Sequence, residues 1–177
     1  MSSKILINKK LINSKVSAIL RSYPQLIVPV NIEELAKMRG IKVIAYPLGE
    51  DVSGLLSLQE GEATIGYNQK EPLTRRRFTI AHELGHYELH RDKSDLFVDK
   101  QFIYRSQSSG DTPVTLAMEQ EANAFASAIL MPTDLLRREI QLTKLNLRDD
   151  DAIGKLARHF DVSTTAMSIR ISGLGFF

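Results

Sequence analysis

The 177-residue sequence contains no cysteine. Disulfide bonds, a thiol nucleophile, cysteine-ligated zinc and regulation through a metal-bound cysteine are therefore excluded. The sequence also lacks any apolar run of the roughly 20 residues that a membrane-spanning helix needs. Its first residues are interrupted too often by Asn, Lys and Ser for the apolar region of a signal peptide. From these absences we expect a cytoplasmic protein without membrane contacts.

The sequence has little net charge, no internal repeat and no low-complexity segment. A net charge of +2 gives a weak overall field and is poor evidence for nucleic-acid binding. The length is typical of one domain, so we predict a single domain over residues 1–177. Within it, residues 1–28 form an N-terminal helical segment of unassigned role, and residues 149–177 form a helical tail.

Hydrophobic periodicity predicts a mostly helical α+β fold. Helical spacing before Pro24 is followed by a second helix, for which Asn31 and Glu34 supply a capping box and Gly40 the stop. Alternating residues over 41–68, with a tight turn at Gly61, predict a sheet of about three strands. Further helices are predicted at 72–90, 113–131, after Pro132, near 149–159 and near 163–172, and residues 91–112 are predicted to form a long loop.

The run "TIAHELGHYELH" (residues 79–90) contains the pattern HExxH. Residues four apart lie on one face of a helix, so His82 and His86 can meet one metal ion. Glu83 lies about 100° around the axis, where it misses the metal but can take a proton from a water on it. The alternative is an ordinary amphipathic helix with hydrogen-bonded histidines. Glycine destabilises a helix interior, so its presence at position 85 indicates that another group packs closely against the helix backbone there.

A catalytic zinc ion normally has a third protein ligand. Asp92 is a poor candidate because a continuing helix carries it far around the axis from His86. Glu119 and Glu121 lie on the next helix, about 200° apart, so one of them at most can face the metal. The apolar residues that surround Glu121 on a helical wheel favour Glu121 as the ligand and leave Glu119 more exposed. The alternative is an ion pair between Glu121 and a basic residue such as Arg76 or Arg77.

Together these motifs resemble the ImmA/IrrE family of zinc metallopeptidases. The resemblance is carried by "RRRFTIAHELGHYELH", by "MEQEANAFASAILMP" and by the C-terminal "LARHFDVSTTAMSIRISGLG". It implies a zincin-like domain with an HExxH active-site helix and one Zn²⁺ per chain. The metal ligands would be His82, His86 and Glu121, as in gluzincins, and Glu83 would be the catalytic carboxylate.

The resemblance also implies a regulatory endopeptidase. Its substrate would be a helix-turn-helix repressor or antitoxin, often encoded nearby, whose cleavage relieves repression of phage, mobile-element or stress-response genes. An exposed strand could hold the substrate by β-augmentation, with "SGLLSLQ" and "ATIGYN" as candidates. Several side chains could stabilise the oxyanion or contact the substrate. These are Tyr87, His90, Tyr67, Tyr104 and Arg105; packing or helix capping is the alternative role of Tyr87 and His90.

Two features point to other partners. Residues 153–171 resemble a helix-turn-helix, so the alternative function is a DNA-binding or partner-binding transcriptional regulator with a non-catalytic metal site. Packing against the catalytic core is the favoured role of these helices, because Arg170 is the only base on the second one. The basic run at residues 75–77 could contact a nucleic-acid activator, although a solvated helix face that also pairs with buried acids is favoured.

Overall fold

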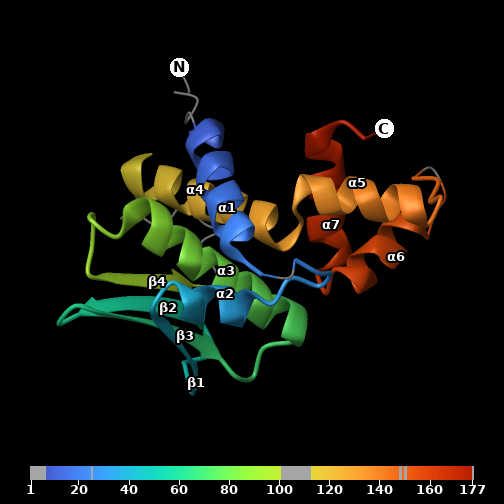
Figure 1. Cartoon of the computed structure of the whole chain (residues 1–177). Helices are drawn as coiled ribbons and strands as arrows, with labels where there is room; N and C mark the ends of the chain where they lie inside the picture. The colour runs from blue at the N-terminus through green and yellow to red at the C-terminus, as the bar shows by residue number, and fades with distance from the viewer. Residues whose placement is uncertain (1–6, 25, 101–112, 148, 150, 177) are drawn as a thin grey trace.

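A computed structural model describes residues 7–24, 26–100, 113–147, 149 and 151–176. The fold is α+β and mostly helical, as predicted (Figure 1). The helices and strands are α1 (Lys9–Ser22), α2 (Ile32–Met38), β1 (Ile41–Tyr46), β2 (Val52–Gln59), β3 (Glu62–Asn68), α3 (Leu73–His90), β4 (Leu96–Lys100), α4 (Pro113–Leu130), α5 (Thr133–Leu142), α6 (Ala152–His159) and α7 (Thr164–Leu174).

Within the described residues the sheet has four strands, one more than predicted, in the order β1-β3-β2-β4. Strand β3 pairs in parallel with β1 and antiparallel with β2, and β2 pairs antiparallel with β4. The sequence prediction placed β4 inside a loop because the segment is only 5 residues long. Its alternation of exposed Leu96 and Val98 with buried Phe97 and Asp99 is nevertheless that of a half-buried strand.

Helix α3 lies between the sheet and helix α4, and α1 packs on α4 (Figure 1). The α5–α7 helices lie together beyond the C-terminal end of α4. The predicted cap of α2 is confirmed: Asn31 Oδ1 accepts the N–H of Glu34 at 3.2 Å, and Gly40 has a φ of +77°. The two long helices α3 and α4 are thus fixed relative to the sheet on one side and α1 on the other.

The predicted close approach at Gly85 is confirmed. A Cβ at this position would lie 3.1 Å from the Cα of Ala122, 3.2 Å from its carbonyl oxygen and 3.2 Å from the Cβ of Phe125. Two of these three atoms belong to the backbone of α4, so no change of rotamer could relieve the contact. Gly85 therefore sets how closely α3 and α4 pack.

We expect Gly85→Ala to destabilise the protein even though alanine is the better helix former. Overpacking costs about 1–3 kcal/mol, whereas exchanging glycine for alanine in a helix gains about 1 kcal/mol. The matched control is Gly173→Ala in α7, where no atom lies within 4 Å of the added Cβ; this variant should be more stable than wild type. Urea unfolding measures both, and a Gly85→Ala protein as stable as Gly173→Ala would contradict the packing argument.

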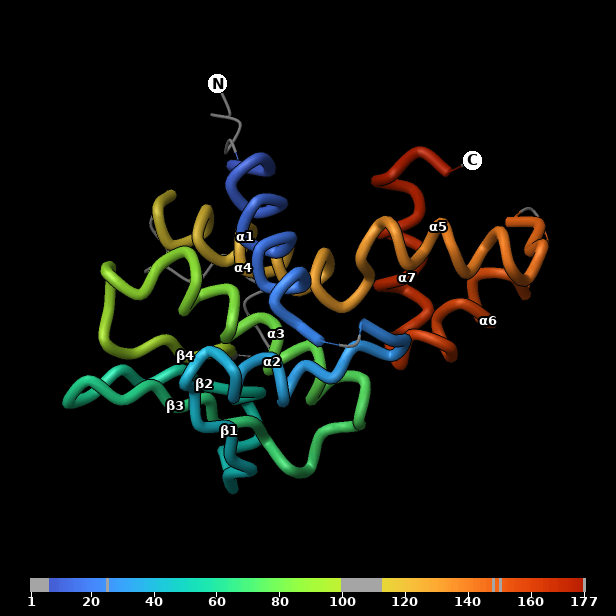
Figure 2. Tube along the Cα trace, viewed as in Figure 1, coloured from blue at the N-terminus to red at the C-terminus, as the bar shows by residue number. Residues whose placement is uncertain are grey.

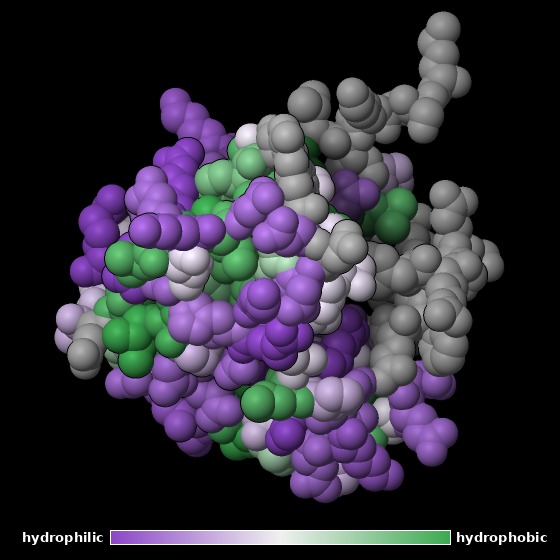
Figure 3. Space-filling view, turned by 90° about the vertical axis from the view of Figure 1, so that its right-hand side faces the viewer, coloured by the Kyte–Doolittle hydropathy of each residue, from purple (hydrophilic) through white to green (hydrophobic). Residues whose placement is uncertain are grey.

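The two helices that resemble a helix-turn-helix pack against the rest of the chain. Phe160, Met167 and Ile171 are fully buried. Arg170 donates to the carbonyl oxygen of Met131 at 3.1 Å and to the hydroxyl of Thr133 at 3.3 Å. The single base of α7 is thus engaged at the end of α4. The face that carries these helices is mostly hydrophilic, with smaller hydrophobic groups (Figure 3).

Candidate metal centre

Three side chains converge where α3 crosses α4. The Nε2 atoms of His82 and His86 lie 3.0 Å apart. Glu119 of α4 contacts both, with its Oε2 3.2 Å from His82 Nε2 and its Oε1 3.3 Å from His86 Nε2. One ligand atom from each residue lies within 4.8 Å of the other two, so the three side chains could hold one ion.

Glu121, the residue expected beside these histidines, lies elsewhere. Its Oε2 is 3.1 Å from His90 Nε2, and its Oε1 accepts the backbone N–H of Asn8 at 3.0 Å. The expected position of Glu121 is therefore wrong, and Glu119 occupies it. The alternative of an ion pair with Arg76 or Arg77 is not observed either, since the recorded partners of Glu121 are His90 and Asn8.

Helix α4 has two covered faces, which explains the error. The apolar residues near Glu121 on the wheel include Ala124 and Ala128, and these face α1. The face toward α3 is instead marked by Ala122, which touches Gly85. Glu119 precedes Ala122 by three residues and so shares its face. Pairing the small residue Ala122 with Gly85 would have placed Glu119 on the face of α4 that meets α3.

Glu83 is fully buried beside this cluster, and neither of its carboxylate oxygens has a hydrogen-bond partner among the described residues. Burial raises the pKa of Glu83 to about 8. An unpaired buried carboxyl group is costly, and a neighbouring cation would lower its pKa and stabilise its charged form. Two adjoining imidazole nitrogens, an anionic carboxylate and this unpaired group thus fit a bound cation.

The protonation equilibria of the three converging residues are coupled. Burial alone would raise the pKa of Glu119, but hydrogen bonds with His82 and His86 outweigh it and lower that pKa to about 2. Burial lowers the pKa of His86. Burial acts on His82 in the same direction, but the hydrogen bond to Glu119 and the charge of Glu83 outweigh it and raise the pKa of His82. Glu119 is thus ionised, as a metal ligand must be.

Further contacts at the Nδ1 atoms and at the ring of His86 fix the orientation of the two histidine side chains. Asn123 Oδ1 lies 3.0 Å from His82 Nδ1, and His90 Nδ1 lies 3.2 Å from His86 Nδ1. The ring of Phe97 on β4 stacks on His86 with centroids 4.7 Å apart. The sequence analysis missed Asn123 and Phe97, although Asn123 is part of the EANAFA motif. With the Nδ1 side of each ring occupied, both Nε2 atoms point to the common centre.

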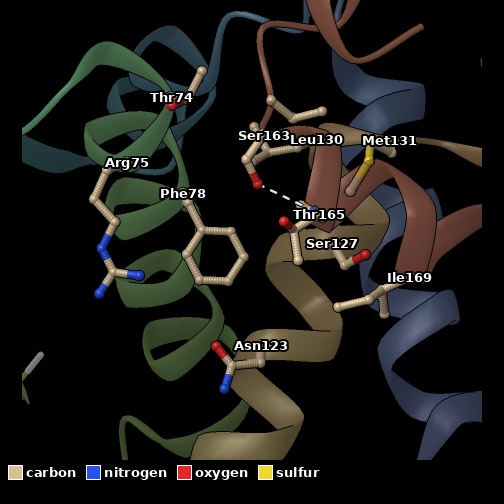
Figure 4. Close-up of a pocket in the computed structure, with 12 residues that line it drawn as sticks. Thr74, Arg75, Phe78, Asn123, Ser127, Leu130, Met131, Ser163, Thr165 and Ile169 are labelled. Carbon is tan, nitrogen blue, oxygen red and sulfur yellow. Dashed lines mark hydrogen bonds between the residues drawn. The ribbon is translucent and has the colours of Figure 1, made fainter. Parts of the chain in front are cut away.

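A pocket of about 410 Å³ opens between α3, α4 and α7. Phe78 of α3 faces Thr165 and Ile169 of α7 across it, and Asn123 of α4 also lines it (Figure 4). The pocket is lined by Thr74, Arg75, Phe78, Asn123, Ser127, Leu130, Met131, Val162, Ser163, Thr165, Ala166 and Ile169. Asn123 lines this pocket and also contacts His82, whereas none of the three converging side chains lines it.

Three of the other predicted site residues, His90, Tyr87 and Tyr67, lie in the part of the chain that the structure describes. Both ring nitrogens of His90 are engaged, by His86 and Glu121. Tyr87 is partly buried in the core, and the Arg91 guanidinium lies 5.1 Å from its ring centroid. Tyr67 lies on β3 opposite Gly54. Tyr104 and Arg105 lie outside the described residues. An oxyanion or substrate role for any of them stays a prediction.

The basic run at residues 75–77 makes contacts within the chain. Arg75 Nη2 lies 3.4 Å from Asp99 Oδ2, which is the pairing with a buried acid that the sequence analysis favoured. Arg77 donates to the carbonyl oxygens of Val30 at 2.9 Å and Asp161 at 3.2 Å. At least two of the three side chains thus connect α3 to neighbouring segments.

A histidine pair on one helix, an adjacent glutamate and a carboxylate from a second helix form the type of site found in metallopeptidases. The chain matches the family model Peptidase_M78, the IrrE N-terminal-like domain, over residues 36–172. The chain therefore belongs to this metallopeptidase family, as the resemblance to ImmA/IrrE indicated.

Two curated proteins are similar to the chain. Metallopeptidase ImmA of Bacillus subtilis (strain 168) is 27% identical over 149 residues, which cover 83% of this chain and 78% of that protein. An uncharacterized immunity region protein 2 of Bacillus phage phi105 is 27% identical over 139 residues, covering 78% of this chain and 79% of that protein. Both alignments cover most of each chain.

A solved structure has the same fold. A Mycobacterium tuberculosis transcriptional regulator superposes with a TM-score of 0.63 at 21% identity, covering 94% of this chain and 48% of that one. The chain thus spans about half the length of that regulator, and the similarity concerns the fold alone. Among the described residues, no helix combines the length and apolarity that crossing a membrane requires.

Proposed function

We propose that the chain is a zinc-dependent endopeptidase in which His82, His86 and Glu119 hold one zinc ion and Glu83 is the catalytic carboxylate. The observation that carries the proposal is the convergence of these three side chains beside the buried, unpaired Glu83. Zinc is the metal chosen because two imidazoles and one carboxylate are an established catalytic zinc set. This set replaces Glu121 by Glu119 and keeps the gluzincin arrangement of two histidines and a glutamate.

The chemistry of peptide cleavage divides between the metal and Glu83. Bound zinc supplies Lewis acidity, which polarises a carbonyl and lowers the pKa of water. Glu83 takes a proton from the attacking water on one carboxylate oxygen and later donates it to the leaving amine. Because neither carboxylate oxygen has a hydrogen-bond partner among the described residues, both are free for this transfer. Glu119, His82 and His86 would hold the zinc ion beside Glu83.

The proposed substrate is a helix-turn-helix repressor or antitoxin whose gene lies near the gene of this chain. Support comes from membership of the family and from the similarity to a protein named metallopeptidase ImmA and to a phage immunity region protein. Cleavage of such a repressor would derepress phage, mobile-element or stress-response genes. Incubating the purified chain with the neighbouring repressor, with and without a zinc chelator, tests the proposal; an intact repressor in the zinc-loaded sample would argue against it.

The second candidate function is a transcriptional regulator that binds DNA or a partner. The fold similarity to a transcriptional regulator is the observation in its favour. Against it, the α7 helix is packed and Arg170 is engaged with Met131 and Thr133. An electrophoretic mobility shift with duplex DNA at moderate salt distinguishes the two functions: a specific shift without repressor cleavage would favour the regulator.

Strand β4 is the strand we propose for holding the substrate. The two strands first considered, "SGLLSLQ" and "ATIGYN", are β2 and β3, and each pairs with strands on both sides. Neither has a free edge, so those candidates were wrong. Strand β4 is an edge strand among the described residues, and its Phe97 stacks on His86. A peptide added to β4 would therefore run close to the proposed zinc.

We expect Val98→Pro to weaken substrate binding without weakening zinc binding. Leu58 donates to the carbonyl of Asp95, so the antiparallel alternation turns the N–H of Val98 away from β2, toward the free edge. Proline removes that donor and no bond within the sheet. One net hydrogen bond is worth about 0.5–1.5 kcal/mol, or roughly a 2- to 12-fold loss in kcat/KM.

Cleavage kinetics with Val98→Thr as the matched control measure this effect. Threonine changes the side chain but keeps the N–H, so Val98→Thr should retain wild-type kcat/KM. Equal rates for the proline and threonine variants would show that the substrate does not pair with β4.

A further inference from the structure

We propose that Glu121 and His90 position His86 as a metal ligand, and that the N-terminal helix α1 holds this pair, so that α1 contributes to metal affinity. The inference rests on the proposed function, because it takes His86 to be a zinc ligand. It gives a role to Glu121, which lies outside the ligand cluster, and to the N-terminal segment, whose role the sequence left unassigned.

A continuous chain of hydrogen-bond contacts runs from α1 to the metal centre. The N–H of Asn8 donates to Glu121 Oε1 at 3.0 Å. Glu121 Oε2 lies 3.1 Å from His90 Nε2, and His90 Nδ1 lies 3.2 Å from His86 Nδ1. His90 and His86 are only 4% and 1% exposed, so water competes little for the contact between their rings, whereas the bond from Asn8 to Glu121 lies at the surface.

The proton positions along this chain follow from the role of His86. A ligand Nε2 must carry a lone pair, so the proton of neutral His86 lies on Nδ1 and is donated to His90 Nδ1. His90 Nδ1 then accepts, and the proton of His90 lies on Nε2, facing Glu121. The Glu121 carboxylate accepts from His90 and from Asn8. Glu121 thereby selects the tautomer of His90 that orients His86.

The other histidine ligand has a simpler support. His82 Nδ1 lies 3.0 Å from Asn123 Oδ1, an amide oxygen that can only accept. An imidazole such as His90 can either accept or donate, so His86 gains a defined acceptor only when a third group fixes the tautomer of His90. Glu121 is that group, and it acts on the metal ligand through His90 rather than directly.

Helix α1 holds Glu121 from outside the family's matched region. Asn8 is the N-cap of α1, and its side-chain oxygen accepts the N–H of Leu11 at 3.0 Å. The buried residues Ile12, Val16 and Ile19 of α1 lie on the side that packs on α4, and Figure 2 shows α1 running across α4. The family model matches only residues 36–172, so α1 and Asn8 lie outside the matched region, whereas Glu121 and His90 lie within it.

Zinc affinity, measured by competition with a chromophoric chelator, tests the positioning role. Glu121→Gln removes the charge with little change of shape, and His90→Phe keeps a ring but removes both nitrogens. Loss of an outer partner of a metal ligand typically weakens affinity roughly 10- to 100-fold, and we expect this for both variants. The matched control is Glu139→Gln, which loses a carboxylate 3.1 Å from His159 Nε2 on other helices and should bind zinc like wild type.

Two substitutions of Asn8 isolate the contribution of α1. Both Asn8→Ala and Asn8→Pro lose the capping side chain, but only proline also loses the N–H that Glu121 accepts. The φ of Asn8 is −79°, which proline adopts without strain. Zinc affinity should be weaker in Asn8→Pro than in Asn8→Ala by roughly 2- to 12-fold, the effect of one net hydrogen bond.

The ¹⁵N shifts of the His90 ring in the zinc-loaded protein separate positioning from general stability. Wild type should show a neutral ring protonated on Nε2, and Glu121→Gln should show a changed tautomer distribution. Tight zinc binding by wild type, with Glu121→Gln, His90→Phe and Asn8→Pro within twofold of it, would overturn this inference and leave the proposed function standing. Absence of zinc binding by wild type would overturn both. If His90→Phe does not fold, the zinc affinities of Glu121→Gln and Asn8→Pro still test the inference.

Discussion

Glu83→Gln is expected to retain zinc and to lose repressor cleavage by about 10²- to 10⁴-fold, the usual contribution of a general base. Glutamine has the shape of glutamate but cannot take a proton from water. The side chain is not among the three that converge on the metal position, so affinity should stay close to that of wild type. Zinc content and single-turnover cleavage, measured on the same preparation, check both halves of the prediction.

Stability measurements provide the control for this variant. Burial raises the pKa of Glu83 from 4.5 to about 8 in the metal-free protein. Between these pH values the folded state keeps a proton that the unfolded state has lost, so stability falls as pH rises. Glu83→Gln should be less sensitive to pH over this window. A variant that loses cleavage because it unfolds more readily than wild type would contradict the catalytic assignment.

Glu119→Ala is expected to weaken zinc binding more than any change at Glu121. Loss of a direct ligand should exceed the roughly 10- to 100-fold cost of losing an outer partner. The removed carboxylate contacts both histidine nitrogens, at 3.2 and 3.3 Å. Zinc binds the folded state, so saturating zinc should raise the melting temperature of wild type and have much less effect on Glu119→Ala.

The comparison of Glu119→Ala with Glu121→Ala distinguishes the two ligand sets. Glu121→Ala leaves the three converging side chains in place, so binding should be weakened but measurable. If Glu121→Ala abolished binding while Glu119→Ala retained it, the ligand set originally expected from the sequence would be right and the observed cluster would not be the metal site.

The sequence predicted the local features of the fold well because each depends on nearby residues. The capping box of Asn31 and Glu34 and the pairing of His82 with His86 on one face are each set within one helix, and the close approach at Gly85 is indicated by the glycine itself. The fourth strand was missed because five residues give too short an alternation to identify against a loop.

The sequence analysis did not place Glu119 beside the histidines, because its position depends on the packing of three helices. A helical wheel of α4 identifies an apolar sector around Glu121 but cannot show that α1 covers it. The sector that meets α3 is set by the contact between Gly85 and Ala122, and this places Glu119 at the histidines. Burial alone therefore did not distinguish the two glutamates, whereas the helix contact did.

Anomalous diffraction at the zinc absorption edge from crystals grown with zinc tests the central claim most directly. The account predicts one peak per chain at about 2.0–2.2 Å from His82 Nε2, His86 Nε2 and a carboxylate oxygen of Glu119, the usual zinc–ligand distances. Glu121 should remain bonded to His90. Absence of a peak between the two histidines, or a peak coordinated by Glu121 in place of Glu119, would contradict the account.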